Sequence, residues 1–238
     1  LSQKVASLGF ADNYRPPPLL EFLQHGLPAG TVEDLEETIL NARLFVMFCV
    51  AQHGLSELKI NVVSMCVIYL YTCECDIYKL MNRGMREGDA KALELWRPFI
   101  YYLVLALRLL PTKRVSVFRG IGIKFNYSIY KKGKTIKWHA FSSTSMSMNA
   151  ATSFLSQGNT GLLFLIHGRT GKPIEKYSKY PTEQEVLFQP NSTFRVDSIR
   201  EISFEQLTDK FELDRLRELT QEEAQRAARV LIEMTELS

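Results

Sequence analysis

The sequence PTKRVSVFRG, residues 111–120, marks the boundary at which the chain changes character. Long apolar segments precede it, whereas short runs of β-branched and aromatic residues, separated by turn residues, follow it. Such runs predict strands, and the predicted strands span residues 115–118, 135–145, 162–167, 185–188 and 194–199. Helices followed by strands without regular alternation indicate an α+β fold rather than a doubly wound parallel sheet.

Before this boundary the sequence predicts an N-terminal helical lobe. The three expected helices span residues 31–53, 57–83 and 89–110. In the first, apolar residues recur at spacings of three and four, Thr31 can cap the start, and Gly54 stands where the helix ends. The other two are apolar on more than one face, which predicts that they are buried.

The C-terminal part of the chain is charged and has a helical pattern. Thr220 and Glu223 form a capping box, which predicts a short helix ending near Leu237. We therefore expect an N-terminal extension, a core whose two parts are the helical lobe and the strand-rich segment, and a helical C-terminal extension. Their expected bounds are residues 1–30, 31–203 (divided into 31–110 and 111–203) and 204–238.

Composition excludes several classes of protein. With 238 residues, 46% of them hydrophobic, the chain is long enough to bury a substantial core. A net charge of +3 from 29 basic and 26 acidic residues argues against a nucleic-acid groove or a polybasic membrane surface. The longest apolar stretches are shorter than the ~18–20 residues that cross a bilayer. We expect no nucleic-acid partner and no membrane span, and the sequence does not indicate an oligomeric state.

The cysteines give no sign of a disulfide framework or a metal site. Cys49, Cys66, Cys73 and Cys75 all lie in the helical half, without regular spacing, which predicts reduced and packed thiols. This favours a cytoplasmic setting, and a secreted one stays open if a signal segment was removed. The Cys73–Cys75 pair lacks a second pair or a histidine at ligand spacing, so we expect no metal.

Three other motifs of nucleotide-binding proteins and hydrolases are incomplete in this sequence. Gly133-Lys134-Thr135 lacks the earlier glycine of a phosphate-binding loop, and Gly120-Ile121-Gly122 lacks the third glycine of a Rossmann fingerprint. The four histidines are scattered, with no serine or cysteine signature near them, so we expect structural histidines rather than a nucleophilic triad.

The strand-rich half contains three short motifs that we interpret together: VFRG at 117–120, FSSTS at 141–145 and YPTEQEVLF at 180–188. Each alone is typical of an ordinary feature, namely a surface ion pair, a strand edge and a solvated turn. In this order and spacing they resemble the arginine, serine-threonine-serine and glutamate-x-glutamate signature of the arginine-specific mono-ADP-ribosyltransferases. That family includes vertebrate ecto-enzymes and bacterial toxins, and the resemblance runs from about Glu33 to Val196.

The resemblance implies a fold and a reaction. It implies that the helical lobe packs on a mainly antiparallel, two-sheet core. It also implies that NAD is the substrate, that nicotinamide is released, and that ADP-ribose passes to an arginine of an acceptor protein. Two alternatives stay open: an NAD glycohydrolase, in which water takes the sugar, and an inactive NAD-binding module of the same fold.

The resemblance also assigns roles to the signature residues. Glu185 stabilises the positively charged sugar and holds the ribose 2′-hydroxyl, and Ser143 orients this carboxylate. Glu183, two residues earlier on the same face of a strand, binds the acceptor guanidinium and helps to remove its proton. Arg119 holds oxygen atoms of NAD, and Gly120 lets the backbone approach the nicotinamide amide.

Further residues are implied with less specific roles. Thr144 and Ser145 join Ser143 as cofactor-binding residues, Phe154 stacks near the nicotinamide, and Tyr180 lies against the acceptor guanidinium. The chain departs from the family in two ways. Phe118 stands where a tyrosine is common, and no cysteine follows Cys75, so the disulfide of the vertebrate ecto-enzymes cannot form.

Overall fold

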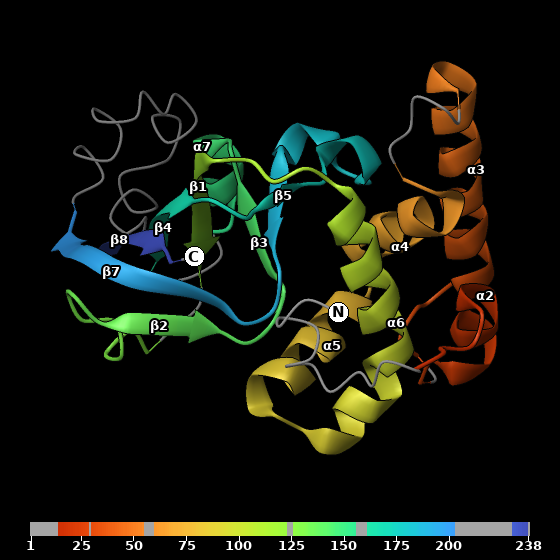
Figure 1. The fold of residues 1–238 in the computed structure, drawn as a ribbon, viewed down its shortest axis with the longest axis horizontal. Coiled ribbons are helices and arrows are strands. Elements are labelled where there is room, and N and C mark those ends of the chain that lie inside the picture. The colour runs from red at the N-terminus through yellow and green to blue at the C-terminus, as the bar shows by residue number, and fades with distance from the viewer. Residues whose placement is uncertain are drawn as a thin grey trace.

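The computed structural model describes residues 14–28, 30–54, 60–122, 126–155, 161–202 and 230–237. Figure 1 shows most helices gathered on one side and the strands on the other, which is the α+β arrangement expected. Among the described helices, none combines the length and the apolar character needed to cross a membrane.

The helical side contains four long helices preceded by two short ones. They are α2 (Leu19–Glu21), the π-helix η1 (Phe22–Gly26), α3 (Leu35–His53), α4 (Val62–Thr72), α5 (Asp76–Glu87) and α6 (Ala90–Leu109). α4 packs against α6 at the centre of this cluster. Its residues Val67 and Ile68 are completely buried, as is Phe99 of α6. Burial of nearly every residue from Ser64 to Tyr71 explains why α4 lacks a polar face.

Two details of the expected helices are wrong. Thr31 does not cap α3, because its hydroxyl donates to the Pro28 carbonyl at 2.7 Å. Instead, Asp34 caps the helix by accepting from the Glu37 amide at 2.8 Å. The single helix expected over residues 57–83 is broken after Thr72, where Cys75 donates its amide to the Cys73 carbonyl in a tight turn. The following helix, α5, therefore runs in a new direction.

The strands form one mixed sheet. They are β1 (Val115–Ile121), β2 (Thr135–Trp138), β3 (Ser142–Ser145), β4 (Leu162–Gly168), β5 (Lys172–Pro173), β6 (Glu185–Phe188), β7 (Ser192–Glu201) and β8 (Val230–Glu236). Their order is β2-β7-β8-β4-β1-β3-β6-β5, and all pairs are antiparallel except β4 with β8. The mainly antiparallel character matches the expectation, but the strands are hydrogen-bonded into one sheet instead of two.

The junction between β1 and β3 explains how one sheet can still resemble two. These strands share a single registered pair, Phe118 with Ser145, whereas β1 pairs with β4 along its whole length. The sheet therefore splays apart beyond this pair. The short helix α7 (Met148–Ser153) packs against β1 near this junction.

The helix expected to end near Leu237 is wrong for the part that the structure describes. Val230–Glu236 is strand β8, inserted between β4 and β7. Val230, Ile232 and Met234 alternate along one face and are buried there, as the period of a strand requires. The predicted capping box at Thr220 and Glu223 lies outside the described residues. The C-terminal end of the chain thus belongs to the sheet.

Glu236 closes this part of the sheet with a buried carboxylate. Its side chain accepts hydrogen bonds from the amides of Arg169 at 2.6 Å and Thr170 at 2.8 Å, and from the Thr170 hydroxyl. These groups belong to the turn after β4, so the last strand stabilises a turn that is far away in the sequence.

We predict that Glu236→Ala lowers the free energy of unfolding by about 2 kcal/mol, because it removes a fully buried carboxylate that accepts part-buried hydrogen bonds from two amides. Chemical denaturation measures this loss. Glu201→Ala, at an exposed position on β7, serves as the control and should change stability by less than about 0.5 kcal/mol. Equal stability of both variants would show that the Glu236 contacts contribute nothing.

Candidate active site

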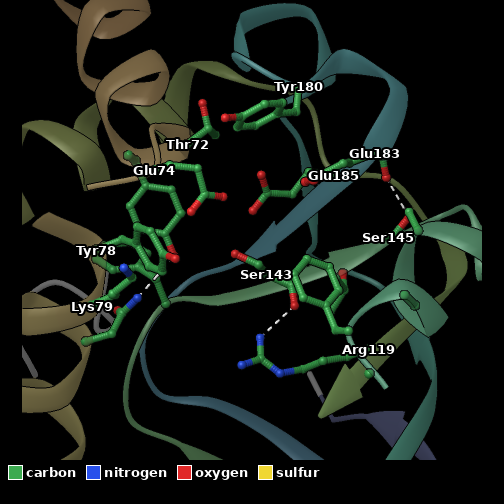
Figure 2. A pocket seen from close by; sticks show the side chains of 18 of the residues that line it. Thr72, Glu74, Tyr78, Lys79, Arg119, Ser143, Ser145, Tyr180, Glu183 and Glu185 are labelled. Atoms are coloured by element: carbon green, nitrogen blue, oxygen red, sulfur yellow. Dashed lines mark hydrogen bonds between the residues drawn. The ribbon is translucent and has the colours of Figure 1, made fainter. Parts of the chain in front are cut away.

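One cleft of about 560 Å³ collects all the site residues predicted from the sequence. It lies between the helical side, which contributes α5 and the turn before it, and the strands β1, β3 and β6. Figure 2 shows the labelled side chains converging on it from both sides. The predicted residues in its lining are Arg119, Gly120, Ser143, Thr144, Ser145, Phe154, Tyr180, Glu183 and Glu185.

Arg119 lies on β1 with its guanidinium turned into the cleft. Nη1 donates to the Ser143 carbonyl at 2.6 Å, a bond that ties β1 to β3 beyond their single registered pair. The guanidinium carbon lies 5.8 Å from the centre of the Trp138 ring, within range of a cation–π contact. Burial lowers the pKa of Arg119, although a guanidinium stays charged at any physiological pH.

Glu185 begins β6 and is the most deeply buried acid of the cleft, with 7% of its surface exposed. The residue before it, Gln184, has a left-handed backbone with φ of 47°, which ends the preceding 3-10 turn and turns the chain into the strand. Burial raises the pKa of Glu185 to about 7; a hydrogen bond from Ser143 opposes this rise, and the nearby charge of Glu183 adds to it.

Polar side chains from the helices lie near this carboxylate. The Asn82 Nδ2 donates to the Tyr71 hydroxyl at 3.2 Å, and the Ser143 side chain lies close enough to Tyr71 and Glu185 to lower the pKa of each. Tyr71 is buried, and burial raises its pKa to about 12, so the hydroxyl keeps its proton. Among the described residues, the Asn82 Oδ1 is buried without a hydrogen-bond partner.

Glu183 lies at the less buried side of the cleft. Burial raises its pKa, and the charge of Glu74 adds to the effect. Its backbone carbonyl accepts from the Ser145 hydroxyl at 2.5 Å, and that hydroxyl accepts from the Ser147 amide at 2.8 Å. Ser145 therefore fastens the turn that carries Glu183.

The hydroxyl of Thr144 is likewise engaged within the protein, because it donates to the Val186 carbonyl at 2.6 Å. Gly120 has a packing reason for lacking a side chain, since an added Cβ would lie 2.0 Å from the Ala151 carbonyl oxygen of α7. Phe154, at the end of that helix, is 49% exposed. Thr144, Gly120 and Phe154 all line the cleft, so the internal contacts of Thr144 and Gly120 are compatible with contact to a ligand.

The helical side contributes residues that sequence analysis left without a role. Tyr71 and Asn82 fell within the family resemblance, but nothing in their local pattern indicated that they face a site. Lys79, Arg83 and Arg86 line the cleft from α5, at spacings of four and three that put them on one face of that helix. Such spacing could have revealed a basic stripe, but not the cleft that it faces.

His167 belongs to a polar network elsewhere on the sheet. Its Nδ1 lies 3.0 Å from the Ser116 hydroxyl and its Nε2 lies 3.0 Å from Glu233, which also accepts from Ser198 at 3.1 Å. The hydrogen bond with His167 lowers the pKa of Glu233. None of these residues lines the cleft, so the network agrees with the structural role expected for the histidine.

Metal ligands do not gather in this site. In the part of the chain that the structure describes, no group of three or more histidine, cysteine, aspartate or glutamate side chains is arranged to hold an ion. The four cysteines are unpaired thiols, with Cys49 and Cys73 buried. Burial raises the pKa of Cys73 to about 11, which keeps it protonated.

Comparison with known proteins identifies the class to which this cleft belongs. The sequence model of the NAD:arginine ADP-ribosyltransferase family matches residues 57–216, which is more than half of the chain. The chain therefore belongs to the NAD:arginine ADP-ribosyltransferase family.

Curated relatives come from bacteria and vertebrates. T-cell ecto-ADP-ribosyltransferase 2 of Mus musculus is 37% identical over 108 residues, covering 44% of this chain and 36% of that protein. The putative NAD(+)--arginine ADP-ribosyltransferase Mav of Mycobacterium avium is 34% identical over 122 residues, covering 51% of this chain but 14% of the relative. The chain thus spans less than half the length of these relatives.

Solved structures of similar fold include bacterial proteins. The ADP-ribosyltransferase HopU1 of Pseudomonas syringae has a TM-score of 0.58 at 18% identity, covering 80% of this chain and 82% of that one. The Vis toxin in complex with an inhibitor has a TM-score of 0.57 at 20% identity, covering 92% and 90%. At such identities the likeness shows the fold, which is that of ADP-ribosyltransferases.

We predict that Glu185→Gln stabilises the protein above pH 7 but not at pH 4. The folded-state pKa of about 7 lies above the ordinary glutamate value of 4.5, so the native state loses stability as the pH rises between these values. A neutral amide escapes this loss, which is on the order of 3 kcal/mol. Denaturation curves at several pH values, with the exposed Glu87→Gln as control, measure the gain. A gain of equal size at pH 4 would contradict the assignment to ionisation.

Proposed function

We propose that this chain is a mono-ADP-ribosyltransferase that cleaves NAD, releases nicotinamide and transfers ADP-ribose to arginine side chains of acceptor proteins. The observation that carries the proposal is the convergence of Arg119, Ser143, Glu183 and Glu185 on one cleft, with Glu185 buried beside Ser143. Membership of the family supplies the reaction class.

Glu185 is the group that assists cleavage of the bond between ribose and nicotinamide. When that bond breaks, its electron pair leaves with nicotinamide and positive charge develops on the sugar. A carboxylate held in a water-poor cleft stabilises such charge more strongly than water does, because it needs no reorganisation. In this proposal Ser143 orients the carboxylate, and the Tyr71–Asn82 pair lies beside Ser143.

The raised pKa of Glu185 serves this role. A buried carboxylate that is costly to ionise in the free protein gains most when a positive sugar appears beside it. The same ionised form accepts a hydrogen bond from the ribose 2′-hydroxyl. The free-energy cost of ionising Glu185 in the free protein is thus recovered as stabilisation of the transition state.

Arg119 and the cations of α5 are suited to the phosphates of NAD. Arg119 presents a planar guanidinium that can bind two oxygen atoms at once. Arg83 and Arg86 line the same cleft and are exposed. The charge of Arg86 lowers the pKa of Arg119, so the two side chains lie near enough to interact electrostatically. The Asn82 Oδ1, which lacks a partner among the described residues, can accept from a ligand.

Glu183 receives the acceptor. An arginine guanidinium has a pKa above about 12 and must lose a proton as its nitrogen bonds to the sugar. Glu183 is half-buried, and its raised pKa makes it a better proton acceptor than a solvated glutamate. Tyr180 lines the cleft on the same side and offers a ring face to the cation.

The glycohydrolase alternative uses the same first step, with water taking the place of the guanidinium. The inactive module would lack a working Glu185, which conflicts with a cleft where every signature side chain is present. We also propose that the catalytic unit comprises residues 31–203 together with β8, because this strand lies within the sheet.

We predict that Glu183→Gln abolishes transfer of ADP-ribose to agmatine while nicotinamide release continues slowly. The variant keeps Glu185, so the sugar is still activated, but it loses the base that accepts the guanidinium proton. Separate assays of ADP-ribosyl agmatine and of nicotinamide distinguish the two steps. Glu185→Gln is the matched comparison and should lower both activities by about 10²–10³-fold. Equal loss of both activities in the Glu183 variant would contradict its acceptor role.

We further predict that nicotinamide release rises with pH, with a midpoint near 7, because Glu185 must be ionised to act. The measurement is kcat/KM for NAD, without an acceptor, across pH 5–9. Glu183→Gln should move the midpoint to lower pH, since the Glu183 charge is one cause of the raised pKa. A midpoint near 4.5 in the native protein would show that the carboxylate is solvated before NAD binds.

A further inference from the structure

A third carboxylate faces the two signature glutamates from the helical side of the cleft. Glu74 lies in the turn between α4 and α5 and is exposed, yet it lines the same cleft as Glu183 and Glu185. Figure 2 shows it reaching into the cleft opposite Glu185. Its position follows from the break after Thr72, which sequence analysis did not predict.

The turn that carries Glu74 is held against the acceptor side of the cleft. Thr72 accepts a hydrogen bond from the Lys179 amide at 2.9 Å, directly before Tyr180. In Figure 2 the side chains of Thr72 and Tyr180 lie beside one another. At the far end of the turn, the Asp76 amide donates to the Thr31 carbonyl at 3.1 Å. The helical turn and the Tyr180 segment thus form one connected rim.

The cleft has two electrostatic poles. Arg86 acts on Arg119 at one pole, whereas Glu74 acts on Glu183 at the other. Among the described residues, no lysine or arginine forms an ion pair with Glu74 or Glu183. Lys79, the nearest basic residue along the chain, is paired with Asp76 at 3.3 Å. Lys179 lies over the Tyr180 ring, 5.6 Å from its centre. The acidic pole is therefore only partly compensated: the charge of Glu74 acts on Lys79, but neither glutamate has an ion-pair partner among the described residues.

A guanidinium fits this pole better than the phosphates of NAD do. Phosphates are repelled by the carboxylates and attracted to the arginine pole. The acceptor guanidinium is planar, permanently charged and has five donors, so it can bind two carboxylates that face one another. Tyr180 supplies an aromatic surface at the same place.

We propose that Glu74 is a specificity-determining residue that binds the guanidinium of the arginine acceptor together with Glu183. This inference rests on the proposed function. In the transfer step, the guanidine nitrogen bonds to the ribose carbon as the nicotinamide bond breaks, and the acceptor proton passes to Glu183. Glu74 takes no proton; its charge holds the guanidinium in place.

The test measures agmatine binding and transfer in parallel. Glu74→Gln should raise the Kd of agmatine, measured by calorimetry with the full chain, about tenfold, because a charge-assisted contact is lost. The KM for agmatine should rise similarly, whereas nicotinamide release without acceptor should stay within about twofold. Glu74→Asp should recover part of the affinity. The control is Glu87→Gln, which removes the same charge from an exposed residue outside the cleft.

The two proposals can fail separately. If the native chain forms ADP-ribosyl agmatine and Glu74→Gln leaves both the Kd and the KM unchanged, the role of Glu74 is overturned and the proposed function stands. If the native chain forms no product but binds agmatine more tightly than Glu74→Gln does, the binding role of Glu74 stands and the proposed transferase activity is overturned. Equal weakening by Glu87→Gln would also overturn the inference, since net charge would then explain the effect.

Discussion

Burying the Glu185 carboxylate between helices and sheet is the constraint on which the cleft depends. Removal from water raises its pKa to about 7, and the surrounding groups limit the cost without cancelling it. The Ser143 side chain and the Arg119 charge both lower this pKa, and Tyr71, which accepts a hydrogen bond from Asn82, lies beside Ser143. The Arg119 side chain also ties the two strands that frame the carboxylate.

This constraint explains features that seem unrelated in the sequence. The sheet splays at the single β1–β3 pair, which opens the space that the cleft occupies. Gly120 lets α7 approach the same junction closely. Ser145 fastens the turn before Glu185, so that the two glutamates reach the cleft from different depths. Their different burial suits them to different chemistry, one with the sugar and the other with the acceptor.

The cleft also separates charge in a way that suits the two substrates of the proposed reaction. The arginines of α5 and β1 suit an anionic dinucleotide, and the carboxylates of the opposite pole suit a cationic side chain. One small cavity can then bring two oppositely charged molecules to the same reacting carbon. The arrangement of the site is thus consistent with the reaction class that family membership indicates.

The sequence by itself determined the α+β class, the approximate positions of most strands and the family, because each depends on short patterns or on a motif in order. It predicted one strand over residues 135–145, where the structure has the two strands β2 and β3. It did not reveal the break after Thr72, the strand β8 or the roles of Tyr71 and Glu74. β8 pairs with β4, with Val230 opposite Leu162. Local propensity does not encode a partner that is so distant in the sequence. Burial and charge coupling at the cleft likewise exist only when distant segments pack together, so only the tertiary structure decided them.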